Sequence, residues 1–147
     1  MDFAEADALI QAIRTVAIRH RALAEKRLAP LGLHTGQEVI LLELDANGPR
    51  TQAQLATSSG CEAPTITHSV RKLEAAGLVT RSPSPTDGRA TIVDLTAQGR
   101  RLMPTLRQAW CALAEETTAM LSSTDHATLT AALADLAAGL SGRPVPR

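Results

Sequence analysis

Residues 61–96 constrain the fold of this 147-residue chain more than any other stretch, because different kinds of local structure follow one another there. Ile66, Val70 and Leu73 recur every three to four residues, which predicts an amphipathic helix with one buried face. Gly77 follows as a helix stop, since glycine adopts the left-handed backbone conformation at little cost. The β-rich sequence after it predicts a hairpin, so helix and hairpin are expected to share one small core.

The predicted hairpin is a two-stranded ribbon that joins 78–81 to 90–95. Its connecting loop, 82–89, holds two prolines, which donate no ladder hydrogen bonds, and an Asp–Gly turn signal. Arg89 is expected near the tip. Asp87 either braces Arg89 through a charge-assisted hydrogen bond or simply forms the turn.

A polar outer helix face beside a basic hairpin suits binding to two adjacent grooves of DNA. Taken alone, the helix fits a solvated surface helix equally well. Threonine and arginine side chains on such a face can meet bases or phosphates, and an arginine at a hairpin tip can enter a minor groove. The residues expected at DNA are Pro64, Thr65, Thr67, His68 and Arg71 in the major groove, Arg89 in the minor groove with Asp87 beside it, and Lys72 and Arg81 at phosphates.

The charge distribution agrees with this placement. The net charge of the whole chain is +0, yet residues 48–101 hold seven basic and four acidic residues, an excess of three positive charges. A local basic excess marks the part of a protein that faces nucleic acid.

Further helices are predicted before this unit. An apolar stripe over 6–29 predicts a long helix that Pro30 ends. Thr35 and Thr51 are each expected to open a helix as the first residue of a capping box. The turn at 58–60 then separates a short helix from the longer one, which is the order of a helix-turn-helix.

Two more helices are predicted after the hairpin. Thr96 is expected to cap a long helix that reaches about Leu121 and is kinked by Pro104. Ser123 or Thr124 is expected to cap a final helix. The terminal helices carry more apolar stripes than one chain of this length has ways to bury, so we expect a second copy to cover them; a monomer that folds them on itself is the alternative.

The order and spacing of these pieces resemble MarR-type (multiple antibiotic resistance regulator) winged helix-turn-helix regulators. Flanking helices extend the likeness over nearly the whole chain. The matching pieces are LGL at 31–33, QAQLA at 52–56, PTIT at 64–67, LEAAGLVTR at 73–81, DGR at 87–89 and LTAQG at 95–99.

The resemblance implies a mainly α fold with a small β-hairpin wing, organised as a winged helix-turn-helix with N- and C-terminal dimerisation helices. The single domain 1–147 would divide into dimerisation helices at 1–34 and 97–140, a DNA-binding lobe at 35–96 and a flexible tail at 141–147. It further implies a homodimer on double-stranded DNA with a pseudo-palindromic operator, and repression of nearby genes that a small molecule such as an aromatic acid relieves. His20, Arg21 and His34 are the candidates for lining the effector pocket.

Other functions receive less support from the residues. The four histidines are dispersed, so no metal site is expected, and no catalytic motif or cofactor-binding loop appears. Cys61 at the start of the second helix of the motif suggests a thiol-based redox switch, although a buried apolar slot is the favoured interpretation; Cys111 is expected in the core or the dimer interface. A winged-helix module that binds protein is a further alternative. The acidic N-terminus, the short apolar runs and the free thiols predict a cytoplasmic protein without membrane contact.

Overall fold

The computed structural model describes residues 1–141 and divides into two compact units, Met1–Leu113 and Ala114–Arg147. The predicted flexible tail at 141–147 lies, except for Ser141, outside the described residues. Ser141 is the last residue of a helix. Each unit is described by itself below.

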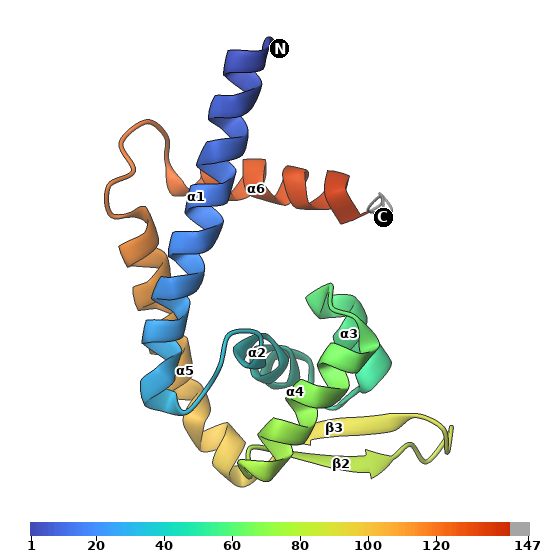
Figure 1. Ribbon diagram of the computed structural model, residues 1–147. Coiled ribbons are helices and arrows are strands. Elements are labelled where there is room, and N and C mark those ends of the chain that lie inside the picture. Colours follow the sequence, from blue (N-terminus) through green and yellow to red (C-terminus); the bar gives the residue numbers. More distant parts are fainter. Residues whose placement is uncertain (142–147) are drawn as a thin grey trace. The chain divides into compact units, whose positions relative to one another are not determined.

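The first unit is mainly helical, with a small sheet at one end (Figure 1). The second unit holds the end of α5 and all of α6 (His126–Ser141). The elements of the first unit are α1 (Phe3–Leu28), the short 3-10 helix η1 (Ala29–Leu31), α2 (Gln37–Asn47), β1 (Arg50–Thr51), α3 (Gln52–Ser59), α4 (Ala63–Ala75), β2 (Val79–Pro83), β3 (Thr91–Leu95) and most of α5 (Ala97–Thr118).

The sheet corrects one prediction. It has three antiparallel strands in the order β1-β3-β2, whereas the sequence predicted a two-stranded ribbon. The third strand pairs Arg50 with Val93 and Thr51 with Ile92. A strand of two residues is too short to show the alternation by which strands are recognised in a sequence.

The helix starts were predicted with mixed success. Thr51 forms the predicted capping box at α3, accepting from Gln54 N at 3.1 Å while Gln54 Oε1 accepts from Thr51 N at 2.9 Å. The capping box at Thr35 was wrong, because Gly36 is the N-cap of α2 and has a φ of 97°. The predicted cap of α6 at Ser123 or Thr124 was also wrong, because Asp125 caps this helix by accepting from Thr128 N at 2.9 Å.

The core of the first unit joins the helices to the sheet. Ile66, Val70 and Leu73, the predicted inner face of α4, are each at most 2% exposed. Removal of this apolar area from water is the main term that holds α4 in place. The other core residues are Leu28, Leu33, Ile40, Leu41, Leu44, Leu55, Leu78, Val79, Val93, Leu95, Met103 and Leu106.

Hydrogen bonds and a close backbone contact join the hairpin to the start of α5. Thr96 caps α5 as predicted, accepting from Gly99 N at 3.0 Å, and its hydroxyl donates to Gly77 O at 2.6 Å. Gly77 has a φ of 74°, so it ends α4 in the left-handed conformation that glycine favours. A Cβ on Gly99 would lie 2.2 Å from Leu78 O, so this close approach requires glycine. The end of α4, the hairpin and the start of α5 therefore form one rigid block.

The terminal helices leave many apolar side chains in solvent. On α1 these include Ile10 and Ile13, and on α6 Leu133 and Leu136, all at least 49% exposed. No described residue of α6 is buried. Within residues 1–141, no helix combines the length and the apolar character needed to span a membrane.

Candidate functional site

The outer face of α4 is exposed, as the periodicity predicts. Pro64, His68 and Arg71 lie in solvent on the side opposite the buried row, and Lys72 is exposed beside them. Thr67 is half-buried, and its hydroxyl donates to Ala63 O at 3.0 Å, so its donor serves the helix itself. The face thus offers small side chains near the helix start and two cations further along.

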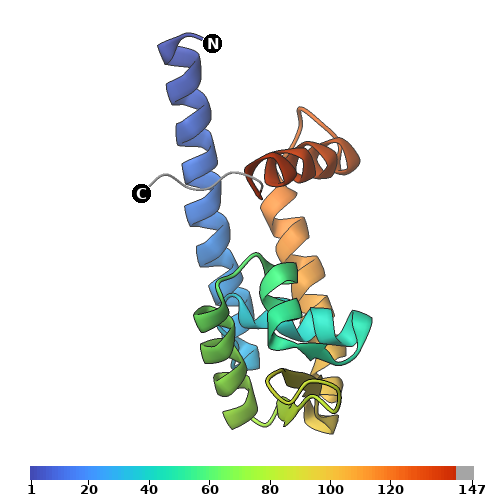
Figure 2. The same ribbon diagram turned by 90° about the vertical axis from the view of Figure 1, so that its right-hand side faces the viewer.

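The hairpin lies beside α4 and ends in the loop that carries Arg89. Figure 1 shows β2 and β3 running out past α4, and Figure 2 shows the hairpin close to end-on with α4 next to it. Asp87 Oδ1 accepts a hydrogen bond at 3.1 Å from the backbone N of Arg89. Of the two roles left open for Asp87, the structure shows turn formation, which leaves the exposed guanidinium of Arg89 to extend from the loop.

Three of the basic residues around the hairpin already have acidic partners. Arg81 donates to Glu74 through Nε at 2.8 Å and Nη2 at 2.7 Å, so the predicted phosphate contact of Arg81 would have to compete with this pair. Arg50 Nε lies 3.5 Å from Glu43 Oε1, and Arg100 Nη2 lies 3.3 Å from Asp94 Oδ1, so these two cations also have acidic partners.

Three of the exposed cations without an acidic partner lie on α4 and the hairpin loop. Within residues 1–141, Arg71, Lys72 and Arg89 are exposed and form no ion pair. Ion pairing therefore leaves four of the seven basic residues of 48–101 unpaired. Three of them lie on the two elements expected to enter the grooves, and the fourth, Arg101, lies on α5.

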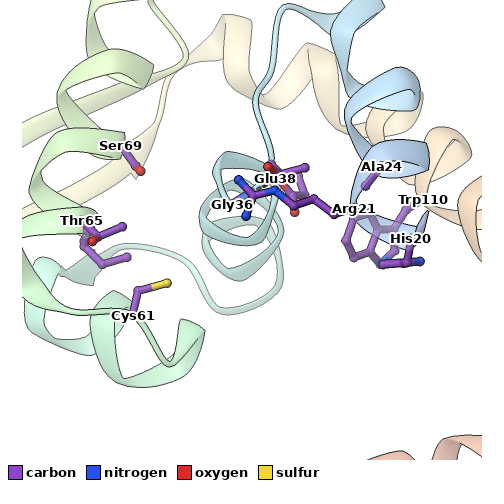
Figure 3. A pocket seen from close by; sticks show the side chains of 11 residues that line it. His20, Arg21, Ala24, Gly36, Glu38, Cys61, Thr65, Ser69 and Trp110 are labelled. Atoms are coloured by element: carbon purple, nitrogen blue, oxygen red, sulfur yellow. Dashed lines mark hydrogen bonds between the residues drawn. The ribbon is translucent and has the colours of Figure 1, made fainter. Parts of the chain in front are cut away.

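A pocket of about 440 Å³ lies behind α4. Its three sides come from α4, from α1 with α5, and from the start of α2, and Figure 3 shows these side chains facing one another. The pocket is lined by His20, Arg21, Ala24, Thr35, Gly36, Glu38, Cys61, Thr65, Ile66, Ser69 and Trp110.

The pocket involves two residues for which the sequence predicted other positions. Thr65, expected at the major groove, is exposed and also lines the pocket, and its predicted DNA contact stays a prediction. Thr65 and Ser69 are four residues apart on α4 and therefore share a side of the helix that differs from the outer face, whereas Cys61 lies two residues before α4 begins. Cys61 was expected in a buried slot, but its thiol is exposed, and Cys111 is exposed as well.

Two of the three residues predicted to line an effector pocket border this cavity. His20 and Arg21 lie on the α1 side. His34 does not line the pocket; its backbone N donates to Gln37 Oε1 at 2.9 Å, before the first turn of α2. Among residues 1–141, no group of three or more His, Cys, Asp or Glu residues is placed to hold a metal ion.

Glu38 is one of the pocket residues that the sequence did not predict, and it is the acidic one. It is only 5% exposed, and its Oε2 accepts a hydrogen bond from Gly36 N at 2.7 Å. Burial raises the pKa of the Glu38 carboxyl above its ordinary value, and hydrogen bonds from the backbone of Glu38 itself and of Gly36 offset part of that effect. The one available signal was an acidic residue in the inward stripe of α2, between Gln37 and Ile40.

Comparisons with known proteins agree with this geometry. The sequence model of the MarR family matches residues 33–91. A crystal structure of a probable transcriptional regulator from Pseudomonas aeruginosa is 33% identical, and the match covers 85% of this chain and 93% of that chain with a TM-score of 0.78. A mutant MarR from E. coli, solved in complex with operator DNA, is 26% identical over 92% of this chain and 99% of that chain, with a TM-score of 0.80.

The chain belongs to the MarR family.

A curated relative supports the same assignment. The transcriptional repressor NicR from Pseudomonas putida is 35% identical over 91 residues, which is 62% of this chain. The matched part spans less than two thirds of the curated relatives, 58% of NicR and 56% of the regulator YwoH from Bacillus subtilis. The fold is the winged helix of MarR proteins, with α3 and α4 as the helix-turn-helix and β2–β3 as the wing.

Proposed function

We propose that this MarR-family chain is a sequence-specific DNA-binding transcriptional regulator. The observation that carries the proposal is the position of the unpaired cations. Arg71 and Lys72 lie on the exposed side of α4, and Arg89 lies at the loop of the wing beside it. A helix of this width fits a major groove, and an arginine on a wing fits the minor groove next to it.

The protein acts as a homodimer on a pseudo-palindromic operator. The support is the exposed apolar surface of α1 and α6, which includes Ile10, Ile13, Leu133 and Leu136. An isologous dimer buries the same surface of both copies and sets two recognition helices about one DNA turn apart. Repression of nearby genes is the regulatory outcome we propose, because NicR, a relative over part of the chain, is named a repressor.

A small molecule bound in the pocket controls the DNA contact. The pocket wall includes Thr65, Ile66 and Ser69 of α4, the same helix whose outer face meets DNA. A ligand that binds better to one position of α4 shifts the population toward that position. The pocket combines an aromatic ring, Trp110, with the cation Arg21, which together favour an aromatic acid.

Selection of duplexes from a random DNA library by the purified protein tests the DNA-binding proposal. A pseudo-palindromic motif with half-sites about ten base pairs apart should be enriched. Binding should weaken steeply with salt, because the contacts made by arginine and lysine release counterions. A library that stays random after repeated rounds would refute sequence-specific recognition.

A further inference from the structure

Glu38 is an unusual residue to find in the wall of an aromatic-acid pocket. It is a carboxylate at 5% exposure, and a group of this kind is rarely buried without a charged partner. Within residues 1–141, no side chain donates a hydrogen bond to Glu38 or forms an ion pair with it. The Gly36 bond engages Oε2, and a carboxylate has about four acceptor sites, so acceptor capacity remains.

The cation of the pocket does not supply that partner. Arg21 lines the same cavity, but its Nε donates to Glu25 Oε1 at 3.3 Å on the surface of α1. Figure 3 shows Glu38 at the start of α2, between the wall formed by α4 and the wall formed by α1 with Trp110. A ligand that fills the cavity therefore meets a Glu38 carboxylate that has backbone donors but, among the described residues, no side-chain donor.

We propose that Glu38 determines the specificity of this pocket by selecting planar aromatic acids that carry an amino group as a hydrogen-bond donor. The inference rests on the proposed function of the pocket as an effector site. The amino group donates to Glu38, the ring lies against Trp110, and the acid group meets Arg21. An aromatic acid without a donor leaves the buried carboxylate of Glu38 unpaired, which costs free energy.

Two probes that differ only in the amino group test the proposal: 4-aminobenzoate and benzoate. Trp110 is the single tryptophan of the chain and lines the pocket, so its indole N–H signal in a nitrogen-15 NMR spectrum reports binding at this site. We expect the full-length protein to bind 4-aminobenzoate about ten-fold more tightly than benzoate, the ratio typical of one hydrogen bond to a charged group.

Glu38→Gln is the informative variant because it keeps the bond to the helix start. The amide oxygen of glutamine can still accept from Gly36 N, whereas its NH2 group then faces the pocket as a donor. The preference for 4-aminobenzoate should be lost or reversed. Glu43→Gln is the matched control, since Glu43 lies on the same helix but pairs with Arg50 and does not line the pocket. This control should keep the preference.

The pH dependence of the probe ratio provides a second readout. As the pH falls through the raised pKa of Glu38, the acceptor is lost and the ratio should fall toward one. The other titratable or charged groups of the lining are His20, Arg21 and Cys61. They act on the carboxylate that both probes share, so they leave the ratio unchanged.

Each outcome decides the proposal. Equal affinities, a preference for benzoate, no response of the Trp110 signal to either probe, or a preference that survives in Glu38→Gln would overturn it. DNA binding of the same samples without ligand is measured in parallel. Intact DNA binding with no amine preference removes only the role of Glu38, whereas absent DNA binding removes the proposed function itself.

Discussion

At the residue scale, the most specific prediction for DNA binding concerns Arg89. Replacing Arg89 by alanine removes an exposed guanidinium from the wing without disturbing the Asp87 turn bond, which uses the backbone N of residue 89. Specific DNA binding should weaken by about 1–3 kcal/mol. Fluorescence anisotropy with a labelled duplex measures this loss. Arg100→Ala is the control, because Arg100 is paired with Asp94; an equal loss in both variants would remove the wing from the interface.

Glu38 also carries a stability prediction whose sign follows from its raised pKa. The folded state disfavours the charged carboxyl, so the wild-type protein is most stable below the ordinary pKa and loses stability as pH rises through the raised value. Glu38→Gln escapes this loss. The variant should be more stable than wild type at neutral pH, and the gain should shrink near the ordinary glutamate pKa of about 4.3. Urea unfolding at both pH values measures it, and a gain that does not vary with pH would contradict the explanation.

At the element scale, the close packing around the start of α5 predicts that substitution by alanine destabilises the protein at Gly99 but not at Gly139. Gly99→Ala forces a Cβ against Leu78 O and should cost about 1–3 kcal/mol of unfolding free energy. Gly139→Ala in α6 meets nothing within 4 Å and should be neutral or slightly stabilising, because alanine favours helices. Urea denaturation of both variants tests the pair. Comparable losses at the two positions would show that the close contact is not what restrains Gly99.

The elements that were predicted correctly are those with their signals close together in the sequence. The buried row of α4 follows from its spacing, and the capping box at Thr51 has both of its residues within one turn. At α2 the same pattern failed, because Gln37 and Glu38 satisfy the backbone N of His34 and Gly36 in place of a threonine cap. Short-range patterns thus find a helix more reliably than they find its first residue.

The same distinction between local and non-local signals applies to the candidate site. The outer face of α4 depends on one helix and was predicted from periodicity, whereas the pocket gathers residues of α1, α2, α4 and α5 that no local pattern connects. The ion pair of Arg81 was not predicted for a related reason: its partner Glu74 lies seven residues earlier, on the other side of the Gly77 turn.

At the scale of the whole molecule, the exposed apolar side chains of α1 and α6 predict the oligomeric state. Analytical ultracentrifugation at micromolar concentration should show a dimer. Glutamate at both Leu133 and Leu136, which are 54% and 55% exposed, should shift the protein toward monomer, because buried unpaired charges oppose association. Asp135→Lys on the same helix is the control at a polar position. A wild-type monomer would rule out the proposed operator geometry.

The central claim is that the unpaired cations of α4 and the wing bind operator DNA. The most direct measurement is an anisotropy titration of the duplex selected from the library, beside a scrambled duplex of the same composition, with wild type and Arg71→Ala. Wild type should prefer the selected duplex, and Arg71→Ala should lose about 1–3 kcal/mol on that duplex with little change on the scrambled one. Equal binding of both duplexes by wild type, or a selected-duplex affinity unchanged in Arg71→Ala, would contradict the claim.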